Sequence, residues 1–510
     1  MKQLISFVLT ILATVGLQAE DDRPNIILVL ADDLGAKELS SYGNTVHHTP
    51  CLDQMAAEGA RFETFYAMPL CTPTRVCLMT GQYGFHNGFL GMQNPAFRPL
   101  PGSPQADIGN HFTHADLLKA HGYATAQIGK WQLSGKLPTL IRDTGFDEYC
   151  MWAYDHNLPE GIQHPSHERA GGNTSRYWHP SIVQNGEYRP TEPGDYGPDI
   201  FNQFALDFAR RHKDQPFFIY YTSLLTHGPH LETPDPNHPG QHLPATFRSN
   251  LEYLDYLMGQ LLDGLKAEGL DENTVVIFVG DNGTGGSGKG SVTEPGARVP
   301  CIIRGPGVKP GLVTRAVGDL TDFLPTLAEY AQAKLPADHP FDGHSLVPVL
   351  TGQKEKHRDW IYSHLDDGRI LRDERWLLQI GKGGKNEQFF DCGESRDGSG
   401  YRDVTDSTDP EVQQARARFA SILAGIPVPK PHPGMESRGD NKPQKPIATE
   451  RNERFRQRDQ NSDGFIDHKE FLATIAGSDQ KAGEARFRKL DTDGDDRISL
   501  EEFRANGAKK

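Results

Sequence analysis

The chain has 510 residues, of which 36 % are hydrophobic and 24 % are charged. This length predicts two or three domains, and the composition excludes a coiled coil and a repeat solenoid. Lys and Arg number 53 and Asp and Glu number 68, which gives a formal net charge of −15. So acidic a chain is a poor candidate for binding nucleic acid, because phosphate contacts need clustered Lys and Arg.

A short apolar run stands at the beginning of the chain. Lys2 precedes the apolar segment 4–17, and Ala19 offers a cleavage point. The run is too short to span a bilayer comfortably, so residues 1–19 are predicted to be a cleaved signal peptide rather than a membrane anchor. No later stretch resembles a transmembrane segment, and the mature chain is expected to be secreted or periplasmic. Six cysteines are too sparse for a disulfide framework in an exported protein of this size.

Short apolar strands alternate with helices over residues 20–339. The predicted strands are 25–30, 123–128, 217–221 and 275–279, and the predicted helices are 50–58, 113–121 and 249–267. This alternation predicts an α/β domain with a mostly parallel central sheet flanked by helices, whose ligands bind at the carboxyl ends of the strands. One site is therefore expected from the polar segments near residues 32, 71, 130, 227 and 281. The alternative for any single Asp or Asn there is a helix cap or a turn.

The pattern weakens after this domain. Residues 340–425 predict a smaller α+β subdomain with a helix over 411–424. Residues 426–450 are rich in proline and charge, which is typical of a semi-rigid or disordered linker. In residues 451–510 an Arg-Phe-Arg sequence recurs, and each copy precedes an acidic loop that ends in Glu-Phe.

Each acidic loop matches the twelve-residue calcium loop of an EF-hand. The ligands expected in the first loop are Asp459, Asn461, Asp463, the Phe465 carbonyl, Asp467 and Glu470. Those expected in the second loop are Asp491, Asp493, Asp495, the Arg497 carbonyl, Ser499 and Glu502. Hard oxygen donors suit Ca²⁺.

Two further features of these loops predict their Ca²⁺ affinity and their pairing. Asp496 stands where glycine is usual, which predicts weakened rather than abolished binding, because Asp tolerates a positive φ better than most residues. Ile466 and Ile498 are expected to pair between the loops. The alternatives are a solvated acidic surface and a dockerin-like module, but Glu at the twelfth position of both loops favours an EF-hand pair.

A candidate nucleophile lies in the sequence Cys71-Thr72-Pro73-Thr74-Arg75, which a helical run ending in Thr80-Gly81 follows. The polar clusters at the strand ends accompany it in the order Asp32-Asp33, Gly129-Lys130-Trp131, Thr226-His227-Gly228, Gly280-Asp281-Asn282 and Gly288-Lys289-Gly290. Residues, spacing and order resemble the sulfatase family over roughly residues 23–395. The resemblance implies an alkaline-phosphatase-like fold and a sulfuric ester hydrolase of the arylsulfatase type.

The resemblance also implies that Cys71 is oxidised to formylglycine during export by a formylglycine-generating enzyme. A hydrated aldehyde carries two hydroxyls, of which one attacks sulfur and the other, once deprotonated, expels sulfate. One divalent cation, Ca²⁺ with Mg²⁺ as the alternative, is implied at the hard oxygens of Asp32, Asp33, Asp281 and Asn282, with residue 71 completing the ligand set.

Four basic side chains have implied catalytic roles. Arg75, Lys130 and Lys289 are expected to hold the sulfate and the nucleophile by fixed positive charge. His227 is expected to protonate the leaving oxygen or to bind sulfate. The alternative for each lysine is a solvated surface charge, which is the usual position of lysine in proteins.

Two departures from the family pattern qualify the expected activity. Gln132 stands where the family has the histidine that acts as base during sulfate release, and glutamine accepts no proton at neutral pH. Glu294-Pro295-Gly296 replaces the usual Glu-Gly-Gly. Three hypotheses therefore stand: a secreted sulfatase acting on a sulfated small molecule or polysaccharide, a phosphate or phosphonate ester hydrolase of the same fold, and a weakly active protein that binds sulfated glycans.

Overall fold

The computed structural model describes residues 22–92, 107–153, 175–396 and 398–427, and in the C-terminal module residues 455, 458, 459, 465–473, 484, 487–492, 494–500, 502 and 503. The expected signal peptide, residues 428–450 of the expected linker, and the expected calcium ligands Asn461, Asp463 and Asp493 lie outside the described residues. Within the described part of the chain, no helix combines the length and the apolar character needed to cross a membrane.

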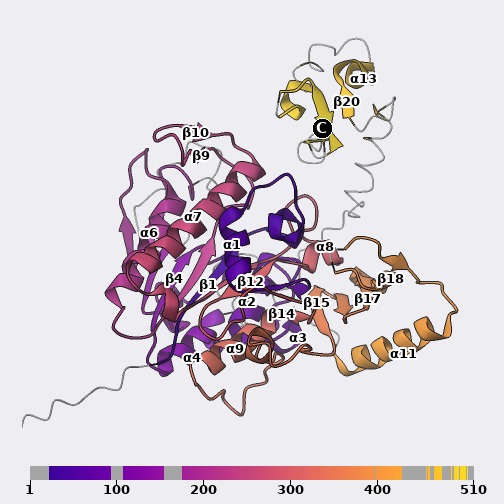
Figure 1. Cartoon of the computed structure of the whole chain (residues 1–510), viewed down its shortest axis with the longest axis horizontal. Helices are drawn as coiled ribbons and strands as arrows, with labels where there is room; N and C mark the ends of the chain where they lie inside the picture. The colour runs from indigo at the N-terminus through magenta and orange to yellow at the C-terminus, as the bar shows by residue number, and fades with distance from the viewer. Residues whose placement is uncertain are drawn as a thin grey trace, which may run out of the picture.

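A ten-stranded sheet forms the centre of the described structure (Figure 1), with the strand order β13-β2-β12-β11-β1-β8-β4-β5-β6-β7. Its middle strands are parallel: β11 (Thr274–Gly280), β1 (Asn25–Ala31), β8 (Phe217–Ser223), β4 (Ala124–Gly129) and β5 (Glu148–Trp152). The sequence prediction of a mainly parallel sheet is confirmed for this middle region, which contains all four predicted strands.

Antiparallel pairs flank the parallel middle of the sheet on both sides, which the sequence pattern does not predict, although the outermost strand over residues 312–314 is parallel to its neighbour. The edge strands are β12 (Cys301–Arg304), β2 (Ala60–Phe62) and β13 (Leu312–Thr314) on one side, and β6 (Ile182–Gln184) and β7 (Glu187–Arg189) on the other. β12 runs against β11 and β2, and β6 runs against β5 and β7. Strands of three or four residues are too short to display a periodicity of their own.

Helices cover both faces of the sheet. One face carries α1 (Pro50–Glu58), α6 (Gly197–Arg211) and α7 (Phe247–Ala267), and the other carries α2 (Cys71–Thr80), α4 (His114–Ala120) and α9 (Phe323–Tyr330). The predicted helices 50–58, 113–121 and 249–267 are confirmed as α1, α4 and α7. Helix α6 is an element that the prediction lacks.

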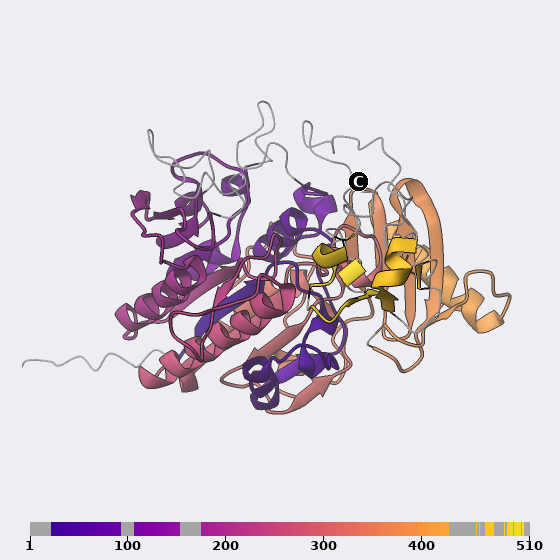
Figure 2. The same ribbon diagram turned by 90° about the horizontal axis from the view of Figure 1, so that it is seen from above.

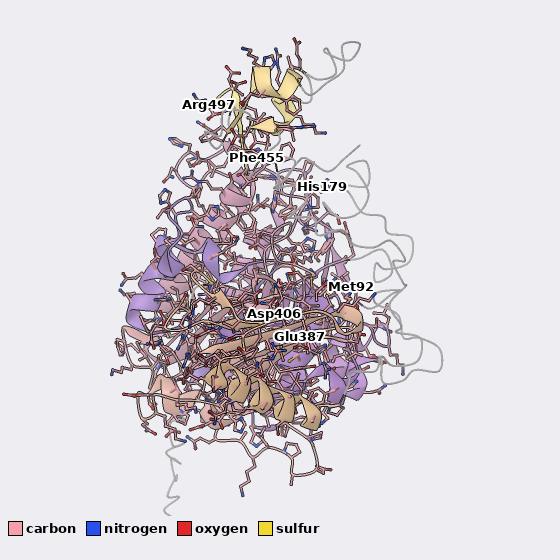
Figure 3. All side chains as sticks on the ribbon, turned by 90° about the vertical axis from the view of Figure 1, so that its right-hand side faces the viewer. Met92, His179, Glu387, Asp406, Phe455 and Arg497 are labelled. Carbon is pink, nitrogen blue, oxygen red and sulfur yellow. The ribbon has the colours of Figure 1, made fainter. Side chains whose placement is uncertain are left out.

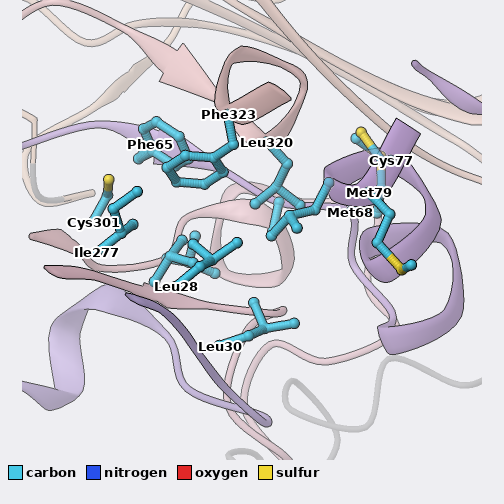
Figure 4. Close-up of a cluster of buried hydrophobic side chains, with 14 of the residues drawn as sticks. Leu28, Leu30, Phe65, Met68, Cys77, Met79, Ile277, Cys301, Leu320 and Phe323 are labelled. Atoms are coloured by element: carbon cyan, nitrogen blue, oxygen red, sulfur yellow. The ribbon is translucent and has the colours of Figure 1, made fainter. Parts of the chain in front are cut away.

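The residues of β1 show how one strand serves two hydrophobic cores. Successive side chains of a strand point to opposite faces, so Ile26, Leu28 and Leu30 pack toward α2, α4 and α9, and Ile27 and Val29 pack toward the opposite helices. All five side chains are fully buried. Figure 4 shows the first of these cores around Leu28 and Leu30. Burial on both faces explains why this strand has a continuous apolar sequence.

The subdomain after residue 340 is a five-stranded antiparallel sheet and a helix, within the described residues, and it confirms the expected α+β class (Figures 1 and 2). Its elements are β15 (Ile361–Leu365), β16 (Gly368–Arg372), β17 (Trp376–Gly381), β18 (Lys385–Asp391), β19 (Arg402–Asp403) and α11 (Pro410–Gly425). The ring of Phe389 stacks on Trp376 and contacts Phe419 of α11 edge-on, so aromatic packing joins the helix to the sheet.

The remaining elements are short. They are β3 (Phe65–Tyr66), α3 (Gly84–Asn87), α5 (Leu140–Asp143), β9 (Thr233–Pro234), β10 (His242–Leu243), α8 (Glu294–Ala297), β14 (Gly318–Asp319) and α10 (Val347–Leu350). In the C-terminal module, β20 (Phe465–Asp467) pairs with β21 (Arg497–Ser499), and α13 spans His468–Ala473. Figure 3 marks this module by Phe455 and Arg497.

Candidate active site

The polar segments that follow four parallel strands meet at one edge of the central sheet. Asp32 follows β1, Lys130 follows β4, His227 comes shortly after β8, and Asp281 follows β11. Parallel strands place their carboxyl ends at the same edge, so residues that are distant in sequence become neighbours. Cys71, the first residue of α2, lies at the same place: the ligand atoms of Asp32, Asp33, Cys71 and His227 all lie within 4.8 Å of one another.

Two lysines neutralise the paired aspartates. Lys130 Nζ lies 2.6 Å from Asp32 Oδ2, and Lys289 Nζ lies 2.7 Å from Asp33 Oδ1. Burial alone would raise the pKa of Asp32, but the charges of Lys130, His227, Arg75 and Lys289 outweigh it and hold that pKa well below its usual range. Neither lysine has the solvated surface position that was its alternative, because Lys130 is buried and Lys289 is largely so.

Arg75 links three of the converging segments. Its Nη2 donates to Asp281 Oδ2 at 3.2 Å and lies 3.9 Å from Asp32 Oδ1, and its Nη1 donates to the Lys130 carbonyl at 3.1 Å. The backbone N–H of Asp33 donates to Asp281 Oδ1 at 2.8 Å. Burial and the neighbouring Asp32 raise the pKa of Asp281. Three carboxylates are thus gathered in a dry site, which needs compensating positive charge.

Two of the candidate metal-binding oxygens lack any hydrogen-bond donor among the described residues. They are Asp32 Oδ1 and Asn282 Oδ1, and both are buried. The amide nitrogen of Asn282 donates to Asp33 Oδ1 at 2.8 Å, which fixes the amide orientation. A buried carboxylate oxygen without a partner is costly, and a divalent cation would satisfy it. The donor set consists of hard oxygens, so it fits Ca²⁺ or Mg²⁺.

Cys71 lies at the N-terminus of α2 and is fully buried. Burial raises the pKa of its thiol to about 12, with Asp281 and Asp32 adding to the effect and Lys130 opposing it. The unmodified side chain is therefore a neutral thiol at pH 7, and a neutral thiol is a poor nucleophile. A hydroxyl-bearing derivative at this position would avoid that difficulty.

His227 presents one nitrogen to the aspartates and one to its own backbone turn. Its Nε2 lies 3.8 Å from Asp33 Oδ2, and its Nδ1 lies 2.6 Å from the carbonyl oxygen of Gly228. Burial lowers the pKa of His227 to about 4, so the ring is neutral at pH 7. Because a carbonyl oxygen only accepts, Nδ1 carries the proton and Nε2 faces the site with its lone pair. Donation from Nε2 to a leaving oxygen then requires the ring to gain a second proton.

Arg176 is a residue of this site that the sequence analysis does not identify. It is buried, and its Nη2 donates to the carbonyl oxygens of His227 at 2.7 Å and Gly228 at 3.0 Å. Its guanidinium lies over the rings of Trp152 and Tyr177. No spacing rule connects an arginine to two carbonyls of a distant turn, so only the fold reveals the contact.

Gln132 lies near the start of α2, because its side chain and that of Thr72 contact the same methionine. Its Nε2 lies 3.5 Å from Met92 Sδ, and the Thr72 hydroxyl donates to the same sulfur at 3.3 Å. The Gln132 side-chain oxygen is buried and has no donor among the described residues. Met92 lies on the face shown in Figure 3. The side chain at position 132 is an amide, which is not a base at neutral pH.

Left-handed backbone conformations occur in three of the site's loops. Asp33 has φ 57°, Gln132 has φ 58° and Thr226 has φ 73°. This conformation is an outlier for a β-branched residue such as Thr226 and costs about 1–3 kcal/mol. The Thr226 hydroxyl donates to the Asp32 carbonyl at 2.5 Å, so the strained residue ties the turn of His227 to the first aspartate loop.

The segment Glu294-Pro295-Gly296 supports the loops that carry Asn282 and Lys289. The Gly283 N–H donates to the Gly296 carbonyl at 2.9 Å. A Cβ atom at Gly283 or Gly288 would lie only 1.9 or 2.0 Å from the Pro295 carbonyl oxygen, so both positions require glycine. The proline is accommodated, because it stands in the first turn of α8.

The described part of the EF-hand module has the expected loop geometry. Ile466 pairs with Ile498 between the loops, as predicted. Asp496 adopts φ 61°, the conformation that favours glycine at this position. Glu502 reaches back across its loop, because its carboxylate accepts from the N–H groups of Thr492 at 2.7 Å and Ser499 at 2.8 Å. Calcium ligation by the two loops remains a proposal.

Two family models match the chain: Sulfatase over residues 24–333, and EF-hand domain pair over residues 451–506. The chain is 34 % identical to arylsulfatase A of Bos taurus over 414 residues, covering 76 % of this chain and 78 % of that protein. It is 32 % identical to N-acetylgalactosamine-6-sulfatase of Rattus norvegicus, covering 67 % and 69 %, and 28 % identical to steryl-sulfatase of Mus musculus, covering 69 % of each.

Solved structures share the same architecture. Ps i-CgsB in complex with k-i-k-neocarrahexaose is 25 % identical, with a TM-score of 0.66, and the match covers 81 % of this chain and 95 % of that chain. PsFucS1 sulfatase from Pseudoalteromonas sp. is 21 % identical, with a TM-score of 0.62, and the match covers 80 % and 92 %. At 21 % identity, the likeness to PsFucS1 sulfatase concerns the fold alone.

Proposed function

Because the chain belongs to the sulfatase family and is a sulfuric ester hydrolase, we propose that it is an exported enzyme that hydrolyses a sulfate ester of a carbohydrate. Formylglycine derived from Cys71 would serve as nucleophile, and one divalent cation, Ca²⁺ or Mg²⁺, would lie at Asp32, Asp33, Asp281 and Asn282. The observation that carries this proposal is the convergence of three buried carboxylates and three cationic side chains on the N-terminus of α2.

The modification of Cys71 supplies the chemistry that the thiol lacks. A formylglycine-generating enzyme would oxidise Cβ by two electrons to an aldehyde and release the sulfur as sulfide, with O2 as oxidant and a pair of thiols giving the other two electrons that reduce the second oxygen atom to water. An aldehyde hydrate offers two hydroxyls on one carbon, so that one can take up the sulfuryl group and the other can release it. Burial of Cys71 at a helix N-terminus suits this role, because free backbone N–H groups favour negative charge there.

The basic side chains of the site would bind and orient the sulfate group. Lys130, Lys289 and Arg75 bring fixed positive charge close to residue 71, and positive charge placed before the reaction stabilises developing negative charge without reorganisation. When bound, a divalent cation would polarise a sulfate oxygen and lower the pKa of the attacking hydroxyl. His227 presents Nε2 to the site and would act as acid only after a second protonation.

Export and carbohydrate specificity extend the proposal. Residues 1–19 would direct the chain out of the cytoplasm, the catalytic domain would span 20–339, its subdomain 340–425, and the linker 426–450 would lead to the calcium-binding EF-hand pair in 451–510. The carbohydrate class is favoured because one structural relative is complexed with a neocarrahexaose and another relative is named for a sulfated amino sugar.

The test is ester hydrolysis by the full chain produced together with a formylglycine-generating enzyme. A chromogenic sulfate, its matching phosphate and phosphonate, and sulfated oligosaccharides are assayed with the same preparation. The proposal predicts turnover of the sulfate ester and of at least one oligosaccharide, and little turnover of the phosphate. Preference for phosphate would favour the related esterase. Binding of sulfated glycan without sulfate release would favour the weakly active binding protein that Gln132 permits.

A further inference from the structure

The turn that presents His227 is held by groups outside its own segment. Arg176 Nη2 donates to the carbonyl oxygens of both His227 and Gly228, and the Tyr177 hydroxyl donates to the His227 carbonyl at 3.1 Å. On the other side of the turn, the Thr226 hydroxyl donates to the Asp32 carbonyl. The backbone of the turn is therefore fixed from two directions.

The partners of Arg176 are unusual for a buried arginine. Among the described residues no carboxylate lies within 4.0 Å of its guanidinium, whose Nη2 donates to two carbonyls, whose plane lies over the faces of Trp152 and Tyr177 at 5.3 and 4.8 Å, and whose Nε has no hydrogen-bond acceptor. A buried cation normally has a carboxylate partner, because desolvation of an unpaired charge is costly. Burying an arginine here is expected to lower the free energy of unfolding. Features kept despite such a cost are often found at functional sites.

The Gly228 carbonyl connects Arg176 to the imidazole. This oxygen lies 3.0 Å from Arg176 Nη2, which donates to it, and 2.6 Å from His227 Nδ1. Arg176 Nη2 also lies 3.5 Å from Nδ1, but that contact is at the outer limit of a hydrogen bond, so the much shorter contact to the carbonyl, which only accepts, places the proton on Nδ1. As long as the carbonyl keeps this orientation, Nδ1 keeps its proton and Nε2 faces Asp33. If the carbonyl rotated away, the ring could turn or exchange its tautomer.

We propose that Arg176 is a positioning residue, which clamps the carbonyls of His227 and Gly228 and thereby fixes the tautomer and aim of the His227 imidazole. This inference rests on the proposed function, in which His227 contacts the sulfate or the leaving oxygen. Arg176 itself acts through the histidine.

The kinetic test is a double-mutant cycle on the full-length enzyme. Arg176→Met removes the donors and keeps the apolar stem, and a displaced catalytic group can lower kcat by about 10²-fold with KM changed by less than about threefold. In the His227→Ala background, measured by single turnover with excess enzyme, the same substitution should change the rate by less than about twofold. Equal losses in both backgrounds would overturn the inference. Arg210→Met, at an exposed ion pair, is the matched control.

A second readout needs no turnover. In protein labelled with ¹⁵N-histidine, the His227 signals are identified by their loss in His227→Gln. We expect protonated Nδ1 in the parent and a shift toward protonated Nε2 in Arg176→Met, or in Arg176→Lys should the methionine variant not fold. An unchanged tautomer would contradict the inference. Because the parent is assayed separately on the chromogenic sulfate, failure of the proposed function is distinguished from failure of this proposal.

Discussion

The catalytic site and the EF-hand module gather oxygen ligands in opposite ways. In the site, Asp32 and Asp281 follow neighbouring strands that are about 250 residues apart in sequence, are buried, and already have cationic partners in Lys130 and Arg75. In the EF-hand module, the expected ligands of each loop lie within twelve consecutive residues. A buried, charge-compensated site is suited to holding a reacting anion, whereas a local loop of oxygen donors is suited to reversible cation binding.

The largest effect that this comparison predicts concerns the nucleophile. Cys71→Ala should lower sulfate ester hydrolysis by at least about 10³-fold, because the remaining groups can bind the ester but cannot form the covalent intermediate. Ca²⁺ binding to the EF-hand module should stay unchanged. The matched control is Cys77→Ala in the same helix, which should retain activity. Full activity of the Cys71 variant would place the nucleophile elsewhere.

Gln132→His tests whether the catalytic site lacks a base for sulfate release. General-base help is worth roughly 10²–10⁴-fold, so release of sulfate is expected to limit the parent and to accelerate by about 10²-fold in the variant. Rapid mixing of the parent with a chromogenic sulfate should give a burst of alcohol near one equivalent of enzyme. Histidine tolerates the left-handed backbone of this position, with φ 58°.

Gln132→Asn is the control for the burst experiment, because it keeps an amide and supplies no base. It should leave the burst in place. A linear trace in the parent, together with a histidine variant that is no faster, would mean that another group already accepts the proton.

Asp496→Gly tests Ca²⁺ binding by the second EF-hand loop. Relief of a strained φ of 61° by about 1 kcal/mol corresponds to roughly fivefold tighter Ca²⁺ binding by the second loop. Calorimetry on the full chain measures this affinity, and kcat should not change. Asp496→Asn removes the charge but keeps a side chain, so a gain of the same size in that variant would attribute the effect to charge instead of conformation.

The smallest predicted effect is the most direct test of independence. Deletion of residues 451–510 should leave kcat on a chromogenic sulfate within about twofold, since the catalytic ligands and cations all lie before residue 340. Reversible Ca²⁺ binding should fall sharply at the same time. A folded truncation that lost hydrolysis would show that the module helps to build the catalytic site.

The contrast also explains what could be predicted from sequence. The continuous apolar run of β1 and the loop spacing around Ile466 and Ile498 are local signals, and both predictions are confirmed. The family motif directs attention to Cys71 and His227. Arg176 escapes prediction because its partners are backbone carbonyls, which leave no trace in side-chain spacing. The antiparallel strands β12, β2 and β6 escape it because each is only three or four residues long.

The strain at Thr226 is likewise invisible in the sequence. A threonine after a strand predicts nothing unusual, yet this one adopts φ 73° and donates to the Asp32 carbonyl. Such a conformation exists only where the surrounding structure imposes it. Sequence reasoning therefore proposes the groups that react, and the fold shows the contacts that hold these groups in place.

The central claim is that hydrolysis depends on an aldehyde at residue 71. The most direct measurement combines mass spectrometry of the peptide containing residue 71 with specific activity, over preparations made with different amounts of formylglycine-generating enzyme. The account predicts that activity on a chromogenic sulfate rises in proportion to the aldehyde fraction and extrapolates to zero when only cysteine is present. Undiminished activity in a preparation whose residue 71 is entirely cysteine would contradict it.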